Sequence, residues 1–153
     1  MIKNKILFMF SFLFNLINKK EDASLKIPDD WRAVRDVDLL DIDVSLIKIH
    51  KIQSLSDSIT TSGVFEQVIG EYQLGLKSLN YLFLNQSMIP EECKSKTTLF
   101  LGTICVDKEN RLWVPKLYHL VFQKEWRMSF FCLSVDRISC KSDIILLSDF
   151  SKN

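Results

Sequence analysis

Residues 99–132, LFLGTICVDKENRLWVPKLYHLVFQKEWRMSFFC, decide the fold, because apolar runs of strand length alternate there with short polar turns. Leu99 to Val106 is the first predicted strand. Asp107–Asn110 is the turn that follows it. Strands joined by so short a turn pair antiparallel with each other, so this half of the chain is predicted to be a sheet.

The same pattern continues toward the C-terminus. Arg111–Phe122 is predicted as the second strand, with Pro115 at an edge, a bulge or a strand start because proline has no N–H to donate. Apolar and polar side chains alternate over Trp126–Cys132, the third strand, and Ile138–Leu147 supplies the fourth. The turns between them are short, which predicts an antiparallel meander.

Helical periodicity precedes the strands. Apolar residues recur every three or four positions over residues 65–83, which predicts an amphipathic helix despite two internal glycines. A short helix is predicted after Pro28-Asp29-Asp30, and residues 40–46 alternate as a further strand. We therefore predict one α+β domain over residues 21–153, an antiparallel β-meander of four to five strands with helices packed on one face.

Charge is nearly balanced over the 153 residues, with a net charge of +1, so we expect no nucleic-acid partner. The acidic residues are nevertheless concentrated, since residues 21–43 carry eight acids against three bases. We call residues 21–43 the acidic band. Two interpretations stay open for it: a solvated face, or a surface that binds a partner.

Residues 1–20 also allow two interpretations. The basic start and the apolar run ILFMFSFLFNLI at residues 6–17 resemble a secretory signal, cleaved near Ala23, which would make the protein periplasmic or exported. Glu21 argues against such a cut, because that position prefers a small residue. The alternative is a structural or interfacial helix that contacts a membrane through residues 6–17. The run is too short to span a bilayer comfortably, and a cytoplasmic location is favoured.

The cysteines do not form a CxxC motif, which argues against a zinc or thioredoxin-type site. Cys132 and Cys140 lie symmetrically about a predicted turn at Asp136, so they are expected to face each other across two strands. They would form a disulfide in an exported protein and remain small buried hydrophobes in the cytosol.

The sequence contains no recognisable arrangement of catalytic residues. His50 and His119 are the only histidines, and no spacing brings them together for acid–base chemistry. Asp41 and Asp43 share a predicted strand face, but no third metal ligand follows nearby. Basic and aromatic residues interleave between Arg111 and Arg127, as any half-buried sheet allows. We expect no enzyme, no cofactor and no metal, with a small hydrolase as the weakest alternative.

The segment from about residue 70 to 134 resembles the small immunity proteins that protect bacteria from contact-dependent growth inhibition toxins. The resemblance rests on Glu71-Tyr72 opening LGLKSL on a helix, on the strand at 99–106, and on LYHLVF at 117–122 followed by QKEW. It implies a non-enzymatic toxin inhibitor that acts by protein–protein interaction with a cognate toxin domain, such as a basic nuclease. The acidic band would be the contact, with Trp31 as its anchor. The implied partner-binding residues are Asp29, Asp30, Trp31, Asp36, Asp38, Asp41 and Asp43. An exported or envelope-associated domain of another role is the alternative.

Overall fold

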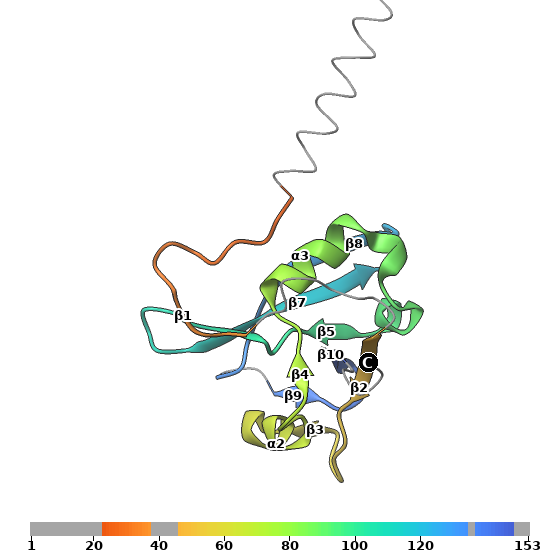
Figure 1. The fold of residues 1–153 in the computed structure, drawn as a ribbon. Coiled ribbons are helices and arrows are strands. Elements are labelled where there is room, and N and C mark those ends of the chain that lie inside the picture. Colours follow the sequence, from red (N-terminus) through yellow and green to blue (C-terminus); the bar gives the residue numbers. More distant parts are fainter. Residues whose placement is uncertain (1–22, 38–45, 135–136, 149–153) are drawn as a thin grey trace, which may run out of the picture.

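The computed structural model describes residues 23–37, 46–134 and 137–148, which form a mixed β-sheet with helices (Figure 1). Eight of the described strands belong to one sheet and two to a small second sheet. The α+β class is therefore confirmed. The strands are β1 (Arg32–Asp36), β2 (Ile47–Lys51), β3 (Ser58–Ile59), β4 (Tyr72–Gln73), β5 (Thr97–Leu99), β6 (Thr103–Val106), β7 (Leu112–Leu120), β8 (Glu125–Cys132), β9 (Ile138–Ser139) and β10 (Asp143–Ser148). The helices are α2 (Thr61–Gln67), α3 (Leu76–Leu84) and the 3₁₀ turns η2 (Gln86–Met88) and η3 (Glu91–Ser95).

The predicted meander is correct only for β6, β7 and β8, which pair antiparallel in chain order. The predicted fourth strand is two strands. β9 pairs with β3 in the small sheet, whereas β10 pairs parallel with β5 and antiparallel with β2 and β4. The turn at residues 140–142 makes this change of sheet, and the Thr97 N–H donates to the Ser142 carbonyl at 2.7 Å to hold it. The sheet is therefore mixed, and the prediction of a four- to five-stranded antiparallel meander was wrong.

The first predicted strand is also interrupted, because β5 ends at Leu99 and β6 begins at Thr103. A Cβ on Gly102 would lie 2.5 Å from the Gln73 carbonyl oxygen, so only glycine lets β4 approach this closely. Pro115 of β7 lies opposite the interruption, and its carbonyl accepts from the Phe100 N–H at 3.0 Å. On this side of β7 the neighbouring strand changes from β6 to β5, so the missing proline N–H interrupts no regular ladder.

Helices cover both faces of the sheet, contrary to the prediction of one covered face. Leu79 and Leu82 of α3 pack with Leu117, whereas Val64 of α2 packs with Val114. Because Val114 and Leu117 lie an odd number of residues apart on β7, they point to opposite faces. Figure 1 accordingly shows α3 and α2 at opposite ends of the view, with strands between them. The central strands have apolar side chains on both faces, so both faces of the sheet must be buried by helices.

The prediction of one continuous helix over residues 65–83 was wrong. α2 ends at Gln67, the chain turns at Gly70 with φ of +79°, and β4 intervenes before α3 begins at Leu76. The short helix predicted after Asp30 was also wrong, since strand β1 follows and pairs with β6. Sheet pairing outweighs the local helix signal in both places. Residues 1–20 lie outside the described residues. The strand predicted at residues 40–46 also lies outside them, except for Leu46.

Candidate functional site

Residues 23–31, here called the N-terminal segment, lie over the face of the sheet that α3 covers. The Leu25 N–H donates to Asn80 Oδ1 at 2.8 Å, and Asn80 Nδ2 donates to the Leu25 carbonyl at 3.0 Å. Leu25 also packs against the core under α3. These contacts join the N-terminal segment to the middle of α3, so it is part of the folded domain.

Trp31 ends this segment and contacts two rings of the sheet. Its centroid lies 4.9 Å from that of Trp113 with the planes 30° apart, and 5.1 Å from that of Phe130 with the planes 62° apart. Offset stacking and edge-to-face packing are the favoured aromatic geometries. Trp31 is half-buried in this internal cluster, so its main contacts are within the chain and its role as a partner anchor stays a prediction.

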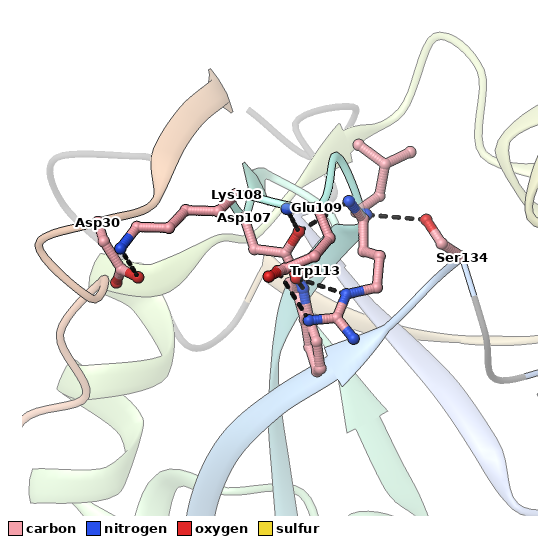
Figure 2. A network of polar contacts seen from close by, with 8 residues as sticks. Asp30, Asp107, Lys108, Glu109, Trp113 and Ser134 are labelled. Atoms are coloured by element: carbon pink, nitrogen blue, oxygen red, sulfur yellow. Dashed lines mark hydrogen bonds and ion pairs between the residues drawn. The ribbon is translucent and has the colours of Figure 1, made fainter.

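Asp107 holds the turn beside this aromatic cluster (Figure 2). Its Oδ1 accepts from the backbone N–H groups of Glu109 and Arg111 at 3.0 and 2.9 Å. Its Oδ2 accepts from Arg111 Nε at 2.7 Å and from Trp113 Nε1 at 2.9 Å. Four donors on one buried carboxylate fix both the β6–β7 turn and the indole on which Trp31 stacks.

These donors also set the charge of Asp107. Burial by itself would raise the pKa of the carboxyl group, but the hydrogen bonds from the Arg111 backbone, the Trp113 indole and the Arg111 guanidinium outweigh it and lower the pKa to about 2. The pKa of Arg111 is raised, first through its hydrogen bond to Asp107. Asp107 is therefore ionised at neutral pH.

The predicted acidic residues fall in two groups. Asp29 and Asp30 are exposed at the turn that leads into Trp31, and Asp36 is exposed on β1. Asp30 Oδ2 lies 3.3 Å from Lys108 Nζ, an exposed ion pair (Figure 2), and Asp36 Oδ1 accepts from Thr103 Oγ1 at 3.1 Å. Asp38, Asp41 and Asp43 lie outside the described residues.

The described part of the acidic band is electrically balanced. Between residues 23 and 37 three acids are matched by three bases, Lys26, Arg32 and Arg35. The acidic excess therefore belongs to Glu21 and Asp22 on one side and to residues 38–43 on the other. Both of these parts of the band flank the described segment in sequence.

The two histidines lie on opposite faces of the sheet. His50 Nε2 is 3.2 Å from Gln67 Oε1 of α2, whereas the His119 ring packs edge-on against Trp126 in the core under α3. In the sheet order, β5 and β10 separate β7 from β2, a distance of about 14 Å at the usual strand spacing. The pair is not brought together for acid–base chemistry.

The prediction that Cys132 and Cys140 face each other across two strands was wrong. Cys132 ends β8, which pairs with β7, and Cys140 follows β9, which pairs with β3, so the two do not face each other across paired strands. All four cysteines are free. Burial raises the pKa of the Cys93 and Cys105 thiols, which keeps them protonated.

The interleaved basic and aromatic residues divide between the two faces. Lys116 lies over the Tyr118 ring at 5.3 Å, on the side of the sheet that α2 covers. Trp113 and Trp126 are on the other side, packed against Trp31 and His119. The sequence pattern therefore does not produce one continuous aromatic platform.

Within residues 23–37, 46–134 and 137–148, no three His, Cys, Asp or Glu side chains are grouped as metal ligands. No helix among the described elements is long and apolar enough to cross a membrane.

Comparisons with protein families, curated proteins and solved structures give no match to this chain. Sequence reasoning missed the Asp107 cluster, although an Asp and an Arg four residues apart across a predicted turn were a readable signal for it.

Proposed function

We propose that this protein is a non-enzymatic binding protein, an immunity protein that neutralises a cognate bacterial toxin domain in the cytoplasm. The resemblance over residues 70–134 motivates the partner class. The observation that carries the proposal is the fixed placement of the charged segment from Asp29 to Asp36, which presents exposed carboxylates on a pre-organised backbone.

Three sets of contacts hold this segment. Trp31 stacks on the sheet, β1 pairs with β6 from Arg32 to Asp36, and Thr103 donates to Asp36. A surface that is ordered before binding loses little conformational entropy when a partner arrives, which favours tight association without a deep pocket. Exposed acids at its ends would steer a basic toxin domain toward it.

The proposed partner is a protein with a basic surface, such as a nuclease. The described segment offers Asp29, which is exposed at the turn, and Asp36, which is exposed on the edge strand β1. The acids at 38, 41 and 43 follow directly in sequence, outside the described residues, and add negative charge to this part of the chain. A cation-rich active site that normally binds phosphates would accept such a row of carboxylates.

The experiment is co-expression with candidate toxin domains of the contact-dependent growth inhibition type, basic nucleases first. We expect rescue of growth, a stoichiometric complex on size-exclusion chromatography, and a higher melting temperature of the mixture, since a partner that binds only the folded state stabilises it. Rescue without a complex, or no rescue at all, would overturn the proposal. The matched control is a toxin domain of another specificity, which should give neither effect.

A further inference from the structure

The first five residues of the N-terminal segment, 23–27, here called the strap, form neither a helix nor a strand (Figure 1). None of the five is fully buried, and Lys26 is exposed. In the described part of the chain, no hydrogen bond between backbone groups joins these residues to the rest of the fold. A segment with so little burial and no backbone ladder belongs to the least stable parts of a structure, which open first.

Two hydrogen bonds with Asn80 hold the strap on α3. Asn80 Oδ1 accepts from the Leu25 N–H, and Asn80 Nδ2 donates to the carbonyl of the same residue. A side-chain amide that pairs with both backbone groups of one residue recognises an extended backbone whatever its side chains are. Main-chain hydrogen bonds of this kind, with a pocket for a side chain, are how proteins bind extended peptides. Asn80 therefore has the chemistry of a peptide-binding residue, and Leu25 is its ligand.

The groove that receives the Leu25 side chain lies between α3 and the start of β8. Leu25 packs against the buried cluster that contains Leu82 and Trp126. The strap does not fill this groove, because a hollow of about 310 Å³ remains between residues 23–25, Phe83 and residues 125–128. A second hollow of about 260 Å³ lies on the other side of Ala23, against Phe83. The groove thus seats one apolar side chain and has room beside it for more of a ligand.

The turn after the strap separates it from the firmly held part of the segment. The Trp31 N–H donates to the Pro28 carbonyl at 2.9 Å, which closes this turn. From Trp31 onward, the stacking on Trp113 and the pairing of β1 with β6 fix the chain. Because proline restricts its own backbone, the Pro28 turn is a stiff boundary. The strap can therefore leave the groove while β1 and the aromatic cluster stay in place.

We propose that the groove between α3 and the start of β8 binds an extended peptide with a leucine-sized apolar side chain, and that the strap occupies this site in the free protein. A peptide ligand must displace the strap, whose short tether gives it an effective concentration on the order of millimolar. Ligands that also fill the two hollows would compete best. The proposal does not depend on the toxin partner, because the ligand contacts Asn80 and the groove rather than the carboxylates from Asp29 to Asp36.

The test titrates a peptide of residues 23–27, blocked at both ends, into the full chain and follows the Trp126 indole N–H by NMR, since Trp126 lines the groove. In the variant Leu25→Ser the strap loses its apolar contact, so the groove should open and bind the peptide. The wild type should bind it about tenfold more weakly, because its own strap competes. A control peptide that carries Leu25→Ser should bind the open variant about tenfold more weakly than the native peptide does.

A second substitution in the open variant tests recognition of the peptide backbone. Asn80→Ala should abolish peptide binding, because both backbone hydrogen bonds are lost. Asn85→Ala is the matched control on the same helix, since the Asn85 side chain donates to the Tyr81 carbonyl, and it should leave binding unchanged. No peptide binding to Leu25→Ser, or equal binding with and without Asn80, would overturn the proposal. A wild-type dimer that Leu25→Ser dissociates would also overturn it, because the groove would then hold the strap of a second copy.

Discussion

Replacing Trp31 by alanine is the sharpest test of how the N-terminal segment is held. The indole is half-buried between Trp113 and Phe130, so about 100 Å² of apolar surface returns to water, which costs about 2.5 kcal/mol. Loss of the two ring contacts adds to this, while relaxation of the denatured chain reduces it. We expect the free energy of unfolding to fall by about 3 kcal/mol.

Urea unfolding followed by far-UV circular dichroism measures this loss without relying on tryptophan fluorescence. Trp31→Phe is the matched control, because a smaller ring keeps both contacts and should cost less than half as much. Hydrogen exchange at the Leu25 amide, which donates to Asn80, should accelerate in Trp31→Ala if the segment opens locally. A loss below about 1 kcal/mol together with an unchanged exchange rate would refute the clamping role of Trp31.

Three further predictions concern other parts of the fold. Asp107→Asn should lower the urea midpoint at neutral pH. Folding lowers the pKa of the carboxyl group from 3.8 to about 2, so its contribution to the free energy of unfolding is present above pH 3.8 and is lost as the pH falls toward 2. The urea midpoints of the wild type and the variant should therefore converge over that range. A constant difference between the two midpoints would contradict this. Gly102→Ala should lower the melting temperature far more than Gly70→Ala, because the new Cβ meets backbone atoms at Gly102 and open space at Gly70, where only the positive φ opposes it. Leu79→Ala should lower the free energy of unfolding by about 2–5 kcal/mol in urea, and Leu84→Ala by less than about 1 kcal/mol, because Leu79 of α3 is fully buried and Leu84 is exposed. Equal losses would contradict the assigned core.

Local pattern predicted the antiparallel part of the fold well. The strands from β6 to β8 and the turn at Asp107–Asn110 follow from alternation and short loops, and the structure has them nearly as predicted. Proline also acted as expected, since Pro115 lies where the neighbouring strand changes. These features depend on contacts between residues close in sequence, which a periodicity argument can capture.

Periodicity could not predict which strands pair when they are far apart in sequence. The parallel contact of β10 with β5 joins residues more than forty positions apart. The polar residues Lys141-Ser142-Asp143 mark a turn within the run from Ile138 to Leu147, but they do not indicate which strand β10 pairs with. The helix predicted over residues 65–83 failed because the apolar spacing is continuous, while Gly70 and Gly75 break the backbone and β4 adds to the sheet between them. Tertiary pairing decided these conformations.

The candidate site was predicted only in part. The exposed positions of Asp29, Asp30 and Asp36 agree with a polar surface, but Trp31 uses its ring inside the fold. The Asp107 cluster, which holds that ring's partner, was missed, although the spacing of Asp107 and Arg111 across the predicted turn indicates it. The charge of the band also differs along its length, because the bases between residues 23 and 37 offset the acids there.

The association rate with the cognate toxin domain tests the proposed function most directly. The measurement compares the wild type with Asp29→Lys/Asp36→Lys at low salt, and with Asp57→Lys as the control, since Asp57 is exposed in the loop between β2 and β3, outside this segment, and pairs with Lys141. We predict association about tenfold slower for the double variant, no change for the control, and convergence of all three rates at high salt. Equal rates for all three at low salt would contradict the assignment of the charged segment from Asp29 to Asp36 as the contact surface, and the absence of any complex would contradict the function itself.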